Sequence, residues 1–73
     1  MNYPKNIKNR IRRIQGQVKG VNRMMDEQES YSKVMTQLQA VISSLESLKT
    51  EMMRQKMKES IVSDVKKTLG IEE

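Results

Sequence analysis

The run NRIRRIQGQVKGVNRMM, Asn9–Met25, holds most of the apolar residues from which the first helix is predicted. Its apolar residues continue a series that starts at Ile7 and alternates steps of four and three residues as far as Met25. A mean step of 3.5 residues is typical of a helix that packs lengthwise against another helix. The spacing therefore predicts a long amphipathic helix, and Pro4, a residue suited to the first helical position, predicts its start.

A second helix is predicted from about Tyr31 to well past Met52, after a polar turn over 26–30. Its apolar residues form two neighbouring lines, the first made of Leu38, Val41, Leu45, Leu48 and Met52 and the second of Met35, Ile42 and Met53. The first helix can cover one line, so the second line requires another chain. Beyond Met57 the pattern weakens, and we expect a break near Ser60 and a short third helix that ends before Gly70.

The size and composition of the chain point to oligomerisation. Its 73 residues make one small domain, 1–73, and a chain of this size usually needs disulfides, a metal or partner subunits to gain a sufficient core. It contains no Cys and no His, which removes disulfides, thiolate ligands and the commonest neutral metal ligand. We therefore predict an all-α homo-oligomer with no metal site and no cofactor.

Several classes of protein are disfavoured. No apolar run approaches the length of a bilayer span, and no secretory signal is recognised, so a cytoplasmic protein without a membrane partner is expected. Catalysis needs convergent groups in a concavity, and the sequence offers neither a His nor a Cys nor a Gly-rich phosphate loop. We do not expect an enzyme.

Charge is distributed in blocks along the chain. Residues 1–25 carry seven basic side chains and no acidic one, whereas 26–51 carry five acidic and two basic ones. A block of one sign indicates a nucleic-acid surface, a plain solvated face or a membrane-surface helix. The last would show Trp, Phe or Leu on its apolar face, and this helix shows Ile, Val and Met. We favour a nucleic acid, whose phosphates several Lys and Arg can contact at once.

Helical geometry sorts these basic side chains. At 100° per residue, Lys5, Arg12, Lys19 and Arg23 share the side away from the Ile/Val seam, with Lys8 beside them. Arg10 and Arg13 are expected on opposite edges of the seam. Their guanidinium groups can bind phosphates or guanine edges bidentately.

Two further features have competing interpretations. Met52, Met53 and Met57 are close enough in sequence to hold a soft metal ion such as Cu(I), although Met at helical spacing is more often core filler. Gly16 and Gly20 lie inside the first helix at a cost of about 1 kcal/mol each relative to Ala. They either permit close approach of a phosphate backbone or a neighbouring helix, or are neutral surface positions.

The runs Asn9–Met25 and Val34–Leu45 (VMTQLQAVISSL) resemble, in this order and spacing, the CsoR/RcnR family of small bacterial transcriptional repressors. The resemblance implies a three-helix protomer whose two long helices form an antiparallel four-helix bundle in a dimer, and two dimers that form a flat tetramer. It also implies binding to double-stranded operator DNA and release by an effector. The DNA-binding candidates on this chain are Lys8, Arg10, Arg12, Arg13, Gln17 and Lys19.

The chain departs from the family at the sensor. Members that sense Cu(I) use a Cys at the start of the second helix, then a His and a Cys four residues apart near its end. The matching positions here are Tyr31, Lys56 and Ser60. Members that sense sulfane sulfur or formaldehyde also need at least one of these thiols. The resemblance thus implies a repressor with an altered or absent sensor and an unknown effector.

Two other hypotheses remain open. The chain could be a helical oligomerisation module that no longer recognises DNA itself and acts on a partner or on an intact paralogue. It could instead sense a ligand other than a thiol-reactive one, an anion being the natural choice beside Lys56.

Overall fold

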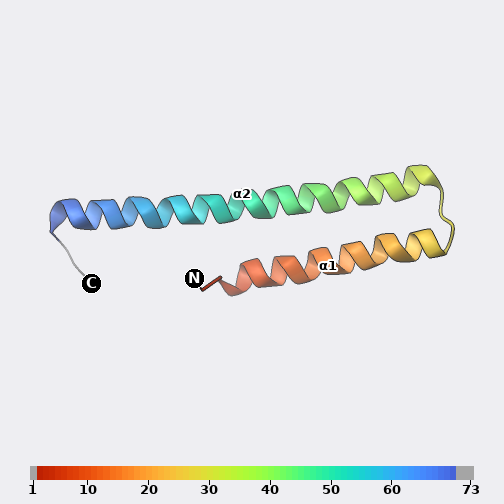
Figure 1. Cartoon of the computed structure of the whole chain (residues 1–73), viewed down its shortest axis with the longest axis horizontal. Helices are drawn as coiled ribbons and strands as arrows, with labels where there is room; N and C mark the ends of the chain where they lie inside the picture. The colour runs from red at the N-terminus through yellow and green to blue at the C-terminus, as the bar shows by residue number, and fades with distance from the viewer. Residues whose placement is uncertain (1, 71–73) are drawn as a thin grey trace.

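The chain folds into an antiparallel helical hairpin (Figure 1). The computed structural model describes residues 2–70, which form helix α1 (Lys5–Asp26) and helix α2 (Tyr31–Leu69) and contain no β-strand. The prediction of an all-helical fold with two long antiparallel helices is confirmed.

The starts of both helices and the turn between them follow local rules. Pro4 lies just before α1 rather than in its first turn, and its carbonyl accepts hydrogen bonds from the amides of Ile7 at 3.1 Å and Lys8 at 3.3 Å. In the predicted turn, Gln28 adopts a left-handed conformation with φ 57°. Ser30 then caps α2, because its hydroxyl accepts from the amide of Lys33 at 3.3 Å and satisfies one otherwise unpaired N–H.

The predicted break near Ser60 is wrong. Helix α2 continues through this position to Leu69 and ends at Gly70, whose φ of 72° is the left-handed conformation that terminates many helices. No Pro or Gly lies between Tyr31 and Leu69, so nothing in the backbone interrupts the helix. In this chain the expected short third helix is the last part of α2.

The core is a single row of side chains from each helix. Six residues are buried, at intervals of seven along each helix: Ile7, Ile14 and Val21 of α1, and Val34, Val41 and Leu48 of α2. Met24 and Met52 pack partly against them. The first line predicted for the second helix is therefore corrected, since Leu45 is 46 % exposed and is not part of this core.

Each buried row has two flanks with different chemistry. On a helix, the residues four and three positions after a buried one lie on opposite sides of it. In an antiparallel pair, the two flanks made by the four-residue step face the same way. Met35 and Ile42, each one position after a buried valine, are turned to the same side as these flanks. We define the apolar flank as Ile11, Val18 and Met25 of α1 with Met35, Leu38, Ile42 and Leu45 of α2.

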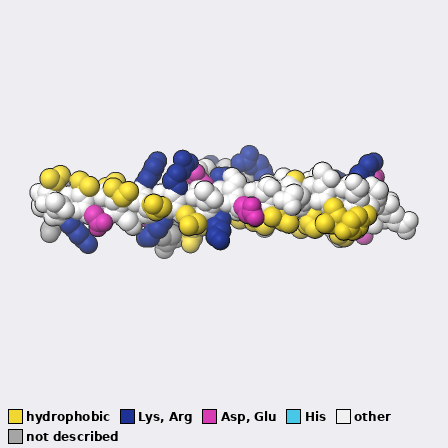
Figure 2. Space-filling model, turned by 90° about the horizontal axis from the view of Figure 1, so that it is seen from above, with side chains coloured by type: hydrophobic (Ala, Val, Ile, Leu, Met, Phe, Trp, Pro, Cys, Tyr) yellow, Lys and Arg dark blue, Asp and Glu magenta, His cyan; other side chains and the backbone are white. Residues whose placement is uncertain are grey.

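All residues of the apolar flank except Leu38 are exposed in the single chain. Figure 2 shows hydrophobic side chains along the lower edge of the molecule at the turn end of the hairpin. The flank made by the three-residue step is polar over the middle of the hairpin, where it carries Arg10, Gln17 and Ser44. The hairpin thus presents one apolar and one polar flank on opposite sides of its core.

The hairpin is elongated. Its extents are 62 × 19 × 12 Å and its radius of gyration is 18.6 Å, against about 11 Å for a compact domain of this length. Helix α1 has 22 residues and α2 has 39, so α2 extends roughly 25 Å past the start of α1 (Figure 1). Exposed apolar residues continue along this overhang: Met57, Ile61, Val62, Val65 and Leu69.

Neither of the two helices in residues 2–70 combines the length and the apolarity needed to cross a membrane.

Candidate functional site

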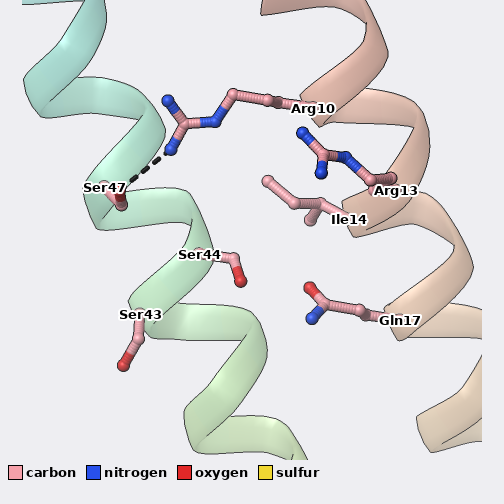
Figure 3. Close-up of a pocket in the computed structure, with 7 residues that line it drawn as sticks. All are labelled: Arg10, Arg13, Ile14, Gln17, Ser43, Ser44 and Ser47. Carbon is pink, nitrogen blue, oxygen red and sulfur yellow. Dashed lines mark hydrogen bonds between the residues drawn. The ribbon is translucent and has the colours of Figure 1, made fainter.

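An open cleft lies between α1 and α2 on the polar flank (Figure 3). Its volume is about 380 Å³. The residues that line it are Arg10, Arg13, Ile14 and Gln17 of α1 and Ser43, Ser44 and Ser47 of α2. Three of the six residues predicted to bind DNA, namely Arg10, Arg13 and Gln17, therefore lie together.

The two arginines lie on the same side of the buried row. Arg10 is half-buried and reaches across the cleft, where its Nη2 donates a hydrogen bond to Ser47 Oγ at 2.9 Å. Arg13 extends into the space between the helices and makes no ion pair with any residue of 2–70 (Figure 3). The predicted placement of Arg10 and Arg13 on opposite edges is wrong, because a step of three residues turns the helix by 300° and leaves the two side chains only about 60° apart.

Gln17 and the serines complete the walls. The Gln17 side chain has a buried Oε1 without a hydrogen-bond partner among the described residues. Figure 3 shows its amide and the Ser44 hydroxyl directed toward each other across the cleft. Ser43 accepts a hydrogen bond from Gln39 Nε2 at 3.3 Å.

Sequence reasoning did not select these three serines as functional residues. Their spacing from the buried residues could have identified them: Ser44 lies three positions after Val41, just as Gln17 lies three positions after Ile14. Equivalent steps place both side chains on the polar flank.

The cleft keeps a net positive charge. Its lining contains two guanidinium groups and no carboxylate. Glu51, one helical turn beyond Ser47, is paired with Arg54, and that hydrogen bond holds the pKa of the Glu51 carboxyl below its ordinary value. Arg10 lowers this pKa further by charge attraction, although less than Arg54 does. Because Glu51 is already engaged by Arg54, Arg10 and Arg13 stay available to an external anion.

The other three candidates lie elsewhere. Lys8, Arg12 and Lys19 are exposed on α1 outside the cleft, and none forms an ion pair with another described residue. They extend the positive surface of α1 but do not share a binding pocket with Arg10 and Arg13.

The three positions that the resemblance assigned to the sensor are separated within one chain. Lys56 and Ser60 border the same shallow groove of α2, and Lys56 Nζ lies 3.9 Å from a carboxylate oxygen of Glu59. Tyr31 is 79 % exposed at the other end of the paired region, 25 residues before Lys56, or about 37 Å along the helix. The three positions can meet only if different chains bring them together.

These positions do not fit a metal ion. They carry a phenol, an ammonium group and a hydroxyl, and residues 2–70 contain no group of three His, Cys, Asp or Glu that could hold a metal. Met52 packs against the core, whereas Met53 and Met57 are exposed. The three thioethers therefore do not share one environment.

The described residues thus form an elongated, all-helical hairpin with an open, arginine-lined cleft. The chain belongs to the family described as metal-sensitive transcriptional repressor, which it matches over residues 3–73. The predicted resemblance is confirmed, and the family is one of regulators, not of enzymes.

One relative supports the same assignment. The chain is 44 % identical over 43 residues to the copper-sensing transcriptional repressor RicR of Mycobacterium tuberculosis. This similarity covers 59 % of the chain and 45 % of RicR, so the chain spans less than half the length of that relative. No solved structure is a significant match.

Proposed function

We propose that the chain is a DNA-binding transcriptional repressor of the cytoplasm that assembles through its apolar flank and contacts the DNA backbone with the basic residues of α1. The observation that carries the proposal is the pair Arg10 and Arg13, whose charges face an open cleft without a carboxylate in its lining. Membership of a repressor family supplies the regulatory context.

Assembly follows from the uncovered apolar surface. A second copy that packs its own apolar flank against the first would bury both and form an antiparallel four-helix bundle. Exposed apolar patches of this kind mark interaction sites, and the elongated shape leaves few other ways to cover them. The apolar residues of the α2 overhang offer a second surface, through which two dimers would form a tetramer.

DNA would be met by the surfaces that assembly leaves free. The cleft lies on the flank opposite the apolar one, so Arg10, Arg13 and Gln17 remain accessible in the dimer. Lys8, Arg12 and Lys19 extend the positive surface and would add phosphate contacts.

We further infer that the repressor does not respond to Cu(I) or reactive sulfur. The chain contains neither Cys nor His, and the matching positions carry Tyr31, Lys56 and Ser60. The effector would be a ligand of another chemistry, held where chains meet.

The presence of Tyr31, Lys56 and Ser60 at the positions matched to the sensor also supports a second candidate function. A chain with an intact apolar flank and altered sensor positions could act by joining an intact paralogue in mixed oligomers. Native mass measurement after co-expression with such a paralogue would detect mixed species, and their absence would exclude this alternative.

The decisive test compares two double variants that each remove two positive charges. Arg10→Ala with Arg13→Ala should abolish binding to the DNA upstream of the protein's own gene and leave the oligomer intact. Lys58→Ala with Lys67→Ala, on the overhang, is the control and should retain most of the affinity.

The salt dependence of the DNA affinity provides a second measurement. In the single variants Arg10→Ala and Arg13→Ala, the loss of one phosphate contact should reduce the slope of log affinity against log salt by about 0.9. Unchanged affinity and slope in the arginine variants would show that the assigned surface does not bind DNA.

A further inference from the structure

The cleft brings hydrogen-bond donors of α2 to the same space as the arginines of α1. Ser47 already accepts a hydrogen bond from Arg10, and a hydroxyl that accepts still has its own hydrogen to donate. Ser44 is half-buried, and its hydroxyl is directed into the cleft (Figure 3). The two walls therefore supply guanidinium and hydroxyl donors to the same cleft.

Gln17 adds a side-chain amide to the same cleft. Its Oε1 is buried without a partner among residues 2–70, although buried polar atoms in folded proteins are nearly always hydrogen-bonded. Because an amide oxygen only accepts, its partner must be a donor such as a water or a hydroxyl, whereas the Nε2 of the same amide is the atom of Gln17 that can donate to an anion.

The arrangement suits a tetrahedral oxyanion. Arginine forks match phosphate oxygens bidentately, and hydroxyls donate to the remaining ones. Donors that converge from two opposite helices can surround a compact phosphate, whereas the flat edge of a base is normally read by side chains that project into a groove of the duplex.

We propose that this cleft is a phosphate-binding site in which Arg10 and Arg13 supply the charge and Ser44 and Ser47 of α2 supply neutral donors to the same oxyanion. The phosphate can be a phosphodiester of bound DNA, in which case the inference rests on the proposed function, or a free phosphate ion. Helix α2 is then a ligand-binding element as well as an assembly element.

The test uses the double variant Ser44→Ala with Ser47→Ala. Alanine has the highest helix propensity, so α2 should stay folded, as circular dichroism would verify. The matched control is Ser32→Ala with Ser63→Ala, which removes two exposed hydroxyls of α2 outside the cleft.

The first arm measures binding to DNA as a function of salt. Loss of two hydrogen bonds to a charged group should weaken DNA binding by the cleft variant about 100-fold, while the control stays within about twofold of the wild type. Because serine is neutral, the salt slope should not change, in contrast to the arginine variants. That combination supports a DNA phosphodiester as the ligand.

The second arm titrates the protein alone with inorganic phosphate at low salt and follows the NMR signals of Ser44, Ser47 and the Gln17 side-chain amide. Saturable shifts in the wild type that vanish in the cleft variant, with DNA affinity unchanged, support a site for a free phosphate ion. Normal DNA affinity in the cleft variant together with no phosphate-dependent shifts in the wild type overturns the proposal.

The two arms also separate this inference from the proposed function. If the wild type binds no DNA at all, the repressor proposal fails, and the phosphate titration alone still decides whether the cleft binds an oxyanion.

Discussion

The substitution Ile42→Ala tests whether two copies of the chain form a dimer through the apolar flank. This side chain is 41 % exposed in the hairpin, so pairing would bury roughly the remaining two fifths. Truncation of a fully buried Ile to Ala costs about 2–5 kcal/mol, and the share that depends on pairing is therefore about 1–2 kcal/mol per copy. A two-fold interface contains the residue twice, which gives about 2–4 kcal/mol per dimer.

This loss should raise the dimer dissociation constant by about 30- to 700-fold, at 1.4 kcal/mol for each factor of ten. Sedimentation equilibrium over a range of protein concentrations measures the shift. Thr50→Ala, an exposed substitution on α2 outside the apolar flank, is the control and should leave the constant unchanged. A dissociation constant for Ile42→Ala within threefold of the wild type would refute the assignment of this flank to the interface.

The remaining predictions concern the helix interior, an ion pair and the effector. A Cβ at Gly16 or Gly20 would meet no atom of the hairpin within 4 Å, so each Gly→Ala substitution should stabilise the protein by about 0.5–1 kcal/mol in urea unfolding; a loss of stability would mean that another chain packs there. Glu51 has a lowered pKa in the folded state, so its charge stabilises the fold above the unfolded pKa, and this contribution is lost as pH falls through the folded pKa. The wild type should accordingly exceed Glu51→Gln in thermal stability at pH 7 and lose this advantage in acid, whereas a pH-independent difference would point to packing instead. Addition of Cu(I) should leave the DNA affinity unchanged in a gel-shift titration, because the chain contains no thiol or imidazole; copper-dependent release of DNA would show that another ligand set, such as the methionines, acts as the sensor.

Most of the fold was predictable from helical periodicity, which is a local property of the sequence. The alternating steps of four and three residues after Ile7 predicted α1, and the polar turn predicted where the chain reverses. The prediction of a break near Ser60 was wrong, because a weaker apolar pattern does not end a helix when neither Pro nor Gly interrupts the backbone.

The candidate site was predictable only in part. The block of positive charge singled out Arg10 and Arg13, since charge is read directly from residue types. Whether they share a cleft with Gln17 and the serines depends on which row of residues each helix turns toward the other. Both Val41 and Leu45 are apolar enough to belong to the buried row of α2. Packing selected Val41, which turned Ser44 toward α1 and left Leu45 exposed.

Residue spacing and residue type are enough to predict a chain that is helical, amphipathic and positively charged at its start. They do not predict which apolar row is buried, which one stays exposed, and which hydroxyls lie beside the arginines, because these depend on how the two helices pack. Contacts with the opposing helix set the rotation of each helix about its axis, and the residues that make them are distant in sequence: Ile7 shares its core with Leu48, 41 residues further along the chain.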